Sequence, residues 1–156
     1  MQPRRCIVTD EGVTFEFELD LFNSGSAPAR DIHIAAVLIN AGATQDQQLE
    51  NFFAQEAGPG ERISIIEPLK RVTFTTQIVT PLDRVQVLEM GGRQVFVPLL
   101  AFNATYRQGR KEGRTSVSYL VGRNGEGEKL APFRLDLGAR VFRGLGARQL
   151  PQGVRD

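Results

Sequence analysis

Apolar and polar residues alternate most regularly in residues 13–22, VTFEFELDLF, where every second side chain is apolar. Successive side chains of a β-strand point to opposite faces, so this stretch predicts a strand with one buried and one solvent-exposed face. Residues 22–31, FNSGSAPARD, interrupt the alternation with Asn, Gly and Pro, which favour a turn. Residues 31–40, DIHIAAVLIN, are mostly apolar on both faces and predict a strand that lies between other elements.

The period changes to that of a helix in residues 44–56, TQDQQLENFFAQE, through the apolar residues Leu49, Phe52 and Phe53. This spacing predicts a short helix inserted between strands, with its two phenylalanines packed over an open end of the core. Thr44 and Gln47 match a capping box at the start of the helix, and Gly58 and Pro59 predict its end.

Further strands are predicted where short apolar runs or alternation return, at 61–69, 71–82, 85–90, 93–102, within 103–122, and at 132–138. The pair Gly91-Gly92 predicts a two-residue hairpin turn. The hairpin at 103–122 has a basic tip, RQGRKEG. Pro98 has no backbone N–H, so we expect an edge position or a bulge at that point.

Between seven and nine short strands with one helix predict an all-β fold, an antiparallel immunoglobulin-like β-sandwich with the helix inserted at about residues 45–56. A closed barrel is the alternative. We expect one domain over residues 1–142 and a flexible C-terminal tail over residues 143–156, because the tail is rich in Gly and Arg.

Two stretches resemble the cell-adhesion-related bacterial (CARDB) domains and allied immunoglobulin-like modules. These are LFNSGSAPARDIHIAAVLINAG at 21–42 and GPGERISIIEPLKRVTFTTQI at 58–78, and the resemblance covers about residues 13–80. It implies a spacer or protein-binding domain of a larger protein and carries no catalytic residues. Residues 116–148, SVSYLVGRNGEGEKLAPFRLDLGARVFRGLGAR, resemble uncharacterised alphaproteobacterial envelope-associated proteins, which implies an extracytoplasmic location with membrane attachment only through a tether outside this sequence.

The composition, with 41% hydrophobic and 24% charged residues, is ordinary for a soluble globular domain. No apolar run approaches the roughly 20 residues of a membrane-spanning helix. The N-terminus has no signal-peptide pattern, which fits either a cytoplasmic protein or a domain cut from a longer chain. Residues 1–106 hold 8 Lys and Arg against 13 Asp and Glu, whereas residues 107–156 hold 11 against 5. This asymmetry fits two attracting faces of one fold better than a partner surface.

One histidine and one cysteine exclude an internal disulfide and most metal centres. We interpret His33 and Cys6 as structural residues. Glu16, Glu18 and Asp20 lie on the polar face of the first predicted strand, and we interpret them as solvent-facing charges, because no calcium-binding loop surrounds them. The glycine-containing stretches GRNGEG and RGLGAR predict turns, since a phosphate-binding loop needs a helix after it.

The best candidates for contact with an anion or a partner are six basic residues, Arg107, Arg110, Lys111, Arg114, Arg140 and Arg143. Nucleic-acid binding is not expected, because only Tyr106 supplies an aromatic ring nearby.

These observations predict a non-enzymatic structural or protein-interaction module of a bacterial envelope protein, with no cofactor. Its partner would be an unknown protein or the rest of its own parent chain. The alternative is binding of anionic lipid or a polyanion through the basic hairpin tip and tail. A carbohydrate-cleaving sandwich enzyme would need two facing carboxylates in a cleft and ranks below both.

Overall fold

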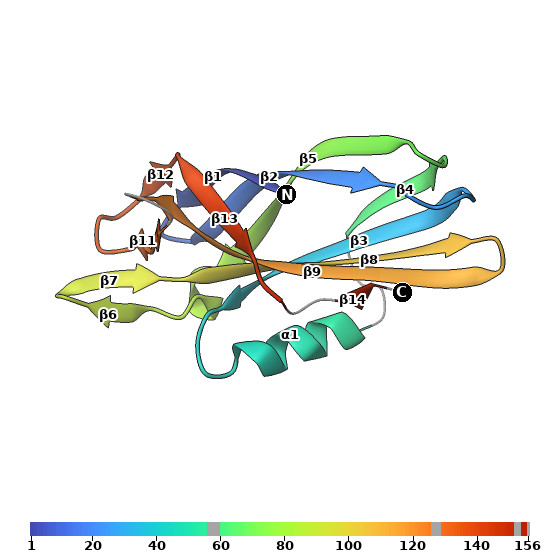
Figure 1. The fold of residues 1–156 in the computed structure, drawn as a ribbon. Coiled ribbons are helices and arrows are strands. Elements are labelled where there is room, and N and C mark those ends of the chain that lie inside the picture. Colours follow the sequence, from blue (N-terminus) through green and yellow to red (C-terminus); the bar gives the residue numbers. More distant parts are fainter. Residues whose placement is uncertain (56–59, 126–128, 152–153, 156) are drawn as a thin grey trace.

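The computed structural model describes residues 1–55, 60–125, 129–151 and 154–155. Two antiparallel sheets stack face to face, and helix α1 (Gln45–Ala54) lies beneath the larger one (Figure 1). The smaller sheet has four strands, in the order β12 (Arg140–Phe142), β1 (Gln2–Val8), β2 (Gly12–Phe22) and β5 (Arg71–Pro81).

The larger sheet has seven strands. Its main path is β10 (Leu130–Ala131), β9 (Lys111–Asn124), β8 (Pro98–Gln108), β3 (Ala29–Asn40) and β4 (Glu61–Ile66). The outer edge of β9 also pairs with β13 (Leu145–Gln149) and β14 (Val154–Arg155). A three-stranded sheet of β11 (Phe133–Arg134), β7 (Arg93–Phe96) and β6 (Leu88–Met90) lies at one end, and the short 3₁₀ helix η1 (Leu82–Arg84) leads into it.

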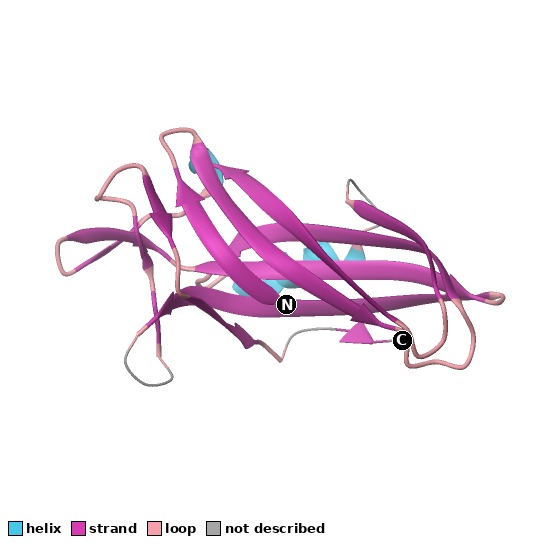
Figure 2. Cartoon of the chain, turned by 90° about the horizontal axis from the view of Figure 1, so that it is seen from above, coloured by secondary structure: helices cyan, strands magenta, loops and turns pink. Residues whose placement is uncertain are grey.

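The predicted fold class is confirmed. The orders β1-β2-β5 and β4-β3-β8-β9 are those of an immunoglobulin-like sandwich, and neither sheet closes into the alternative barrel. Seven of the described strands have six residues or more and build this sandwich, while the others are two to five residues long. Seen from above, the smaller sheet runs obliquely across the larger one (Figure 2).

The strand predicted at 13–22 forms β2, whose partner β5 follows it without a bulge from Gly12 to Phe22. The strand predicted at 31–40 forms most of β3, and its double apolar character has a clear cause. Ile32 and Ile34 face the smaller sheet, whereas Val37 and Ile39 pack on the side of α1. The larger sheet is therefore covered on both faces in this region.

The helix is confirmed at Gln45–Ala54, but its predicted packing is wrong. Leu49 and Phe53 contact Ile39 and Leu99 on the outer face of the larger sheet, and so they do not cover an open end of the sandwich. The predicted capping box is also wrong, because Thr44 makes no capping hydrogen bond with its side chain.

The hydroxyl of Thr44 instead accepts a hydrogen bond of 2.8 Å from Gln48 Nε2. The predicted stop at Gly58-Pro59 lies outside the described residues.

Both predicted hairpins form, as β6–β7 and β8–β9, but the arm predicted at 93–102 is divided between β7 and β8. Gly91 and Gly92 have φ angles of 58° and 76°, which the two-residue turn requires and which side chains with a Cβ disfavour. Pro98 lies neither at an edge nor at a bulge. It is the first residue of the central strand β8, where the chain leaves the three-stranded sheet for the larger sheet.

The two ends of the chain differ from expectation. Residues 2–8 form β1, which the alternation did not predict. The strand predicted at 132–138 is reduced to Phe133–Arg134. Residues 145–149 of the predicted tail form β13, which pairs with β9. The expected division at residue 142 therefore falls between two paired strands, and the flexibility of the tail stays a prediction.

The two ends of the sandwich are packed differently. At one end, which we call the closed end, Phe15, Phe96, Phe133 and Phe142 form one cluster of rings. Phe133 lies 5.4 Å from Phe15, 5.2 Å from Phe96 and 5.4 Å from Phe142, measured between ring centroids. The other end, where β2 leads into the turn before β3, is open.

Candidate binding groove

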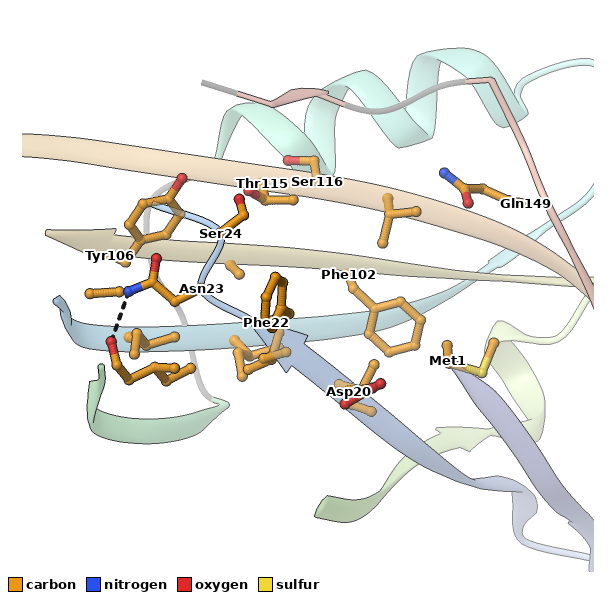
Figure 3. A pocket seen from close by; sticks show the side chains of 18 of the residues that line it. Met1, Asp20, Phe22, Asn23, Ser24, Phe102, Tyr106, Thr115, Ser116 and Gln149 are labelled. Carbon is orange, nitrogen blue, oxygen red and sulfur yellow. Dashed lines mark hydrogen bonds between the residues drawn. The ribbon is translucent and has the colours of Figure 1, made fainter. Parts of the chain in front are cut away.

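A groove of about 910 Å³ lies between the two sheets at the open end. We call it the open-end groove. Its lining comes from the last residues of β2, the turn after it, β3, β8, β9, Met1 and residues 149–151. In Figure 3 the labelled side chains extend along it, from Met1 and Gln149 at one end to Asn23 and Tyr106 at the other. The groove has the size of a ligand site.

The groove exists because β1 is shorter than β2. Gln2 pairs with Glu18, and beyond this pair β1 does not continue. Residues 19–22 of β2 pair with β5 on one side, and no described strand lies on the other side. Beneath them the larger sheet continues out to β9, so one strand position in the smaller sheet is vacant.

The floor of the groove consists of side chains of β8 and β9 that face the smaller sheet. Phe102 anchors it, with its ring centroid 5.0 Å from that of Phe17 and 6.0 Å from that of Tyr119. Tyr119 and Val117 are only half-buried, although they pack against the core. Burial raises the pKa of the Tyr119 hydroxyl, so the ring stays neutral at physiological pH.

Glycine at position 113 fixes the position of the Tyr106 ring in this floor. A Cβ at Gly113 would lie 2.4 Å from Tyr106 Cε2 and 2.5 Å from its Cζ. The ring therefore lies directly across the backbone of β9, and it extends the aromatic floor toward the hairpin tip.

Asn23 closes the end of the groove and explains the composition of FNSGSAPARD. Its buried side chain donates hydrogen bonds of 2.9 Å to the carbonyl oxygens of Ala27 and Ile66. Its Oδ1 accepts from the Gly25 N–H at 3.0 Å and from Gln108 Nε2 at 3.3 Å. One side chain thus ties the β2–β3 turn to both β4 and β8.

The rim on the β2 side carries charge that is already paired. Asp20 accepts hydrogen bonds from Arg71 and from the Thr73 hydroxyl, and these lower the pKa of its carboxyl group, the Thr73 bond most strongly. The Arg71 guanidinium also lies 5.2 Å from the ring centroid of Phe22, which is 49% exposed.

The six basic residues predicted as contacts lie at opposite ends of the molecule, the hairpin tip and the region of β12 (Figure 1). Two of those in the hairpin have internal partners. Arg107 lies 3.7 Å from the Asp31 carboxylate, and Arg114 donates to the carbonyl oxygens of Phe53 and Gln55 at the end of α1. Arg110 and Lys111 are exposed at the tip. Anion binding by these residues stays a prediction.

A second hollow, of about 450 Å³, lies near the β6–β7 turn and includes Arg123 and Arg134. Both guanidinium groups are bound within the chain. Arg123 Nε donates to the Pro132 carbonyl oxygen at 2.9 Å, and Arg134 forms an ion pair with Asp136. This hollow is therefore a weaker candidate for a binding site than the open-end groove.

The residues that the sequence marked as structural have the following places. Cys6 is fully buried in β1, and this burial raises the pKa of its thiol. His33 is 4% exposed on the α1 side of β3, and its Nε2 has no hydrogen-bond partner among the described residues.

The predicted solvent-facing carboxylates lie on the outer face of the smaller sheet, where Arg5 pairs with Glu16 and Arg4 with Glu18. Within the described ranges, no group of three or more His, Cys, Asp or Glu residues could hold a metal ion. No described helix is long and apolar enough to span a membrane.

The glycine stretches are placed only in part. Gly122 of GRNGEG pairs with Gly146 of RGLGAR across β9 and β13. A Cβ at Gly146 would lie 2.3 Å from Asn124 Oδ1, so a larger residue there would displace the Asn124 side chain. The rest of GRNGEG extends into residues 126–128, outside the described ranges.

Comparisons of the chain with protein-family models, with curated proteins and with solved structures found no match. Candidate residues therefore come from the geometry alone. The sequence analysis missed Leu21, Tyr106, Val117 and Tyr119 as groove residues, because alternation marks them as inward-facing core positions. Nothing in the sequence analysis indicated that β1 ends at Gln2, which is what leaves these side chains uncovered.

Proposed function

We propose that this protein is a non-enzymatic protein-interaction module that binds an extended polypeptide segment in the open-end groove. The observation that carries the proposal is the unpaired edge of β2 at residues 19–22, directly above an apolar floor. A segment bound there would add a strand to the smaller sheet.

A polypeptide fits this site better than a small apolar molecule. Alternate residues of a strand direct their N–H and C=O groups to the same neighbour, so the free edge offers regularly spaced donors and acceptors. Another backbone in the extended conformation satisfies them all. The floor residues Val117 and Tyr119 then receive the alternate side chains of the bound strand.

The register of β1 defines how the bound segment would run. Pro3 pairs with Phe17 and Gln2 with Glu18, in antiparallel orientation. A strand that continues this line beyond Met1 would face Asp20, Leu21 and Phe22 in turn. Its residue opposite Leu21 would point into the groove and would be apolar, because paired residues share one face of a sheet.

The lining of the groove also supports a role without catalysis. Among the described lining residues, Asp20 supplies the only carboxylate, and Arg71 and Thr73 already donate hydrogen bonds to it. A glycosidase needs two carboxyl groups on either side of the scissile bond. The partner would be another protein or a further part of the parent chain. The resemblance of residues 116–148 to bacterial envelope-associated proteins supports an envelope location as part of this proposal.

Selection from a phage-displayed peptide library tests the proposal. We expect enriched peptides to carry apolar residues at alternate positions and to bind the wild-type protein. The double variant Val117→Arg, Tyr119→Arg fills the groove with charge and should lose this binding, whereas Val141→Arg, at a 44% exposed position on β12, should keep it. Equal binding by all three proteins would refute the groove as the site.

A tethered strand tests the register. Three residues, Thr-Val-Lys, added before Met1 should pair with residues 20–22 and slow hydrogen exchange of the Asp20 and Phe22 amides, because linkage raises the effective concentration to about the millimolar range. The control addition Pro-Val-Pro keeps the central valine but lacks the two N–H groups opposite Asp20 and Phe22, the residues whose backbone groups point to the vacant edge. If both additions leave exchange of the Asp20 and Phe22 amides equally fast, β2 does not accept a strand.

A further inference from the structure

Strand β5 forms the second free edge of the smaller sheet, and it is built differently from the groove. It pairs with β2 along all eleven of its residues, Arg71–Pro81, without a bulge. Its other side has no strand partner among the described residues. Residues 72–80 contain no charged side chain and no proline. Long, uncharged edges without a bulge are sites of pairing with another chain.

The other sheet edges carry features that prevent such pairing. β4 has six residues and begins with Glu61 and Arg62, and β12 has three residues and begins with Arg140. The outer edge of β9 is covered by β13 and β14. Only β5 combines length with a lack of charge among the strands described.

We infer that β5 pairs with β5 of a second copy of this chain, antiparallel and related by a two-fold axis at Thr76. Thr76 is the midpoint of Arg71–Pro81, so this register pairs the whole strand. In most of the resulting cross-strand pairs, the two residues have similar polarity. On the face toward the sandwich, Phe74 lies opposite Ile78, Val72 opposite Thr80, and Thr76 opposite Thr76. On the outer face, Thr75 lies opposite Gln77 and Thr73 opposite Val79.

These pairs favour a second copy over an unrelated strand. An aromatic residue opposite a β-branched one and Thr opposite Thr are stabilising cross-strand pairs, and no like charges meet within the strand. Phe74 is half-buried, because the sheet ends beside it, and the pairing would cover its exposed side. The smaller sheets of two copies would then form one continuous sheet.

One group opposes the pairing and makes the register testable. Glu61 Oε1 accepts a hydrogen bond of 3.1 Å from Thr76 Oγ1, so the axis brings two Glu61 carboxylates near each other. The variant Glu61→Gln keeps an acceptor and removes the charge. We expect it to associate at least several-fold more tightly than the wild-type protein.

Sedimentation equilibrium of the full chain over about 5 to 500 µM, which covers weak dissociation constants, tests the inference. The wild-type mass should rise with concentration from 17.3 kDa toward twice that value. Thr75 and Gln77 are exposed, so their variants should fold, as circular dichroism can verify. Thr75→Lys with Gln77→Lys sets lysine opposite lysine twice and should remain monomeric.

Thr75→Lys with Gln77→Glu sets lysine opposite glutamate and should associate. A monomeric wild-type protein, or equal association of the two double variants, would overturn the inference. So would loss of association in Val117→Arg, Tyr119→Arg, since the dimer would then run through the groove. Association that persists in this groove variant supports the β5 edge whatever the outcome of the peptide selection.

Discussion

The closed and open ends of the sandwich are formed by the same two sheets, yet the side chains between the sheets are covered to different extents at the two ends. At the closed end Phe15, Phe96 and Phe133 are completely buried, and the three-stranded sheet and β12 supply the covering rings. At the open end Val117 and Tyr119 face the same interior and stay half-buried. Stability therefore concentrates at one end, and the surface free to bind lies at the other.

The largest effect should follow from removing a ring of the closed end. Phe133→Ala deletes the ring that contacts three others, and we expect a loss of about 3–5 kcal/mol in the free energy of unfolding. The matched variant Phe22→Ala, at the exposed rim of the groove, should cost about 1 kcal/mol or less. Urea denaturation followed by circular dichroism measures both. Equal losses would contradict the distinction between the two ends.

The turn that closes the groove should be the most sensitive polar feature of the open end. Asn23→Ala removes the side-chain donor to the buried carbonyl oxygen of Ile66 and the acceptor of the Gly25 N–H, and we expect a loss of about 2–3 kcal/mol. Ser26→Ala, at an exposed position of the same turn, serves as the control. Hydrogen exchange should show faster opening at residues 23–27 in the first variant alone.

A smaller effect is expected outside both ends, at the junction of β9 and α1. Arg114→Ala removes the guanidinium from the C-terminal carbonyl groups of the helix and should cost about 1 kcal/mol. Arg110→Ala, at the exposed hairpin tip, should leave stability unchanged. Urea unfolding and amide exchange in α1 distinguish the two. An equal response would place Arg114 among the solvent-exposed charges of the tip.

The smallest effect concerns the outer face that both ends share. The hydrogen bond from Arg5 lowers the pKa of the Glu16 carboxyl, as Thr73 and Arg71 lower that of Asp20. Such groups stabilise the folded state above the ordinary carboxyl pKa of about 4, and this contribution is lost as the pH falls through the lowered pKa. Glu16→Gln and Asp20→Asn should each weaken the dependence of the urea midpoint on pH between 7 and 3. A wild-type-like pH profile in both would contradict these pairs.

The sequence was sufficient for the fold class and for most of the strands that build the sandwich. The alternation in β2 reflects a strand that is covered on one face, and the apolar character of both faces of β3 reflects a strand that is covered on both. The pair Gly91-Gly92 reflects the positive φ angles that its turn requires. Residues 2–8 were missed as β1, because Arg4 and Arg5 hide the buried positions Pro3, Cys6 and Val8. The C-terminal strands were missed because they gain their stability from pairing with β1 and β9, a long-range contact that local pattern does not contain.

The groove could not be predicted for a related reason. Periodicity shows that Val117 and Tyr119 point inward, but whether a strand lies above them depends on where β1 ends. The hairpin at 103–122 was predicted well, yet Arg114 was assigned to its basic tip, since the sequence cannot show that α1 ends beside it.

The rings of the closed end come from positions 15, 96, 133 and 142, so the cluster draws on nearly the whole length of the chain. During synthesis the first two strands emerge long before β12, the neighbour that covers β1. The sandwich can therefore complete its core only after residue 142 has left the ribosome, and folding should be slow for its size and dependent on protection of the early strands.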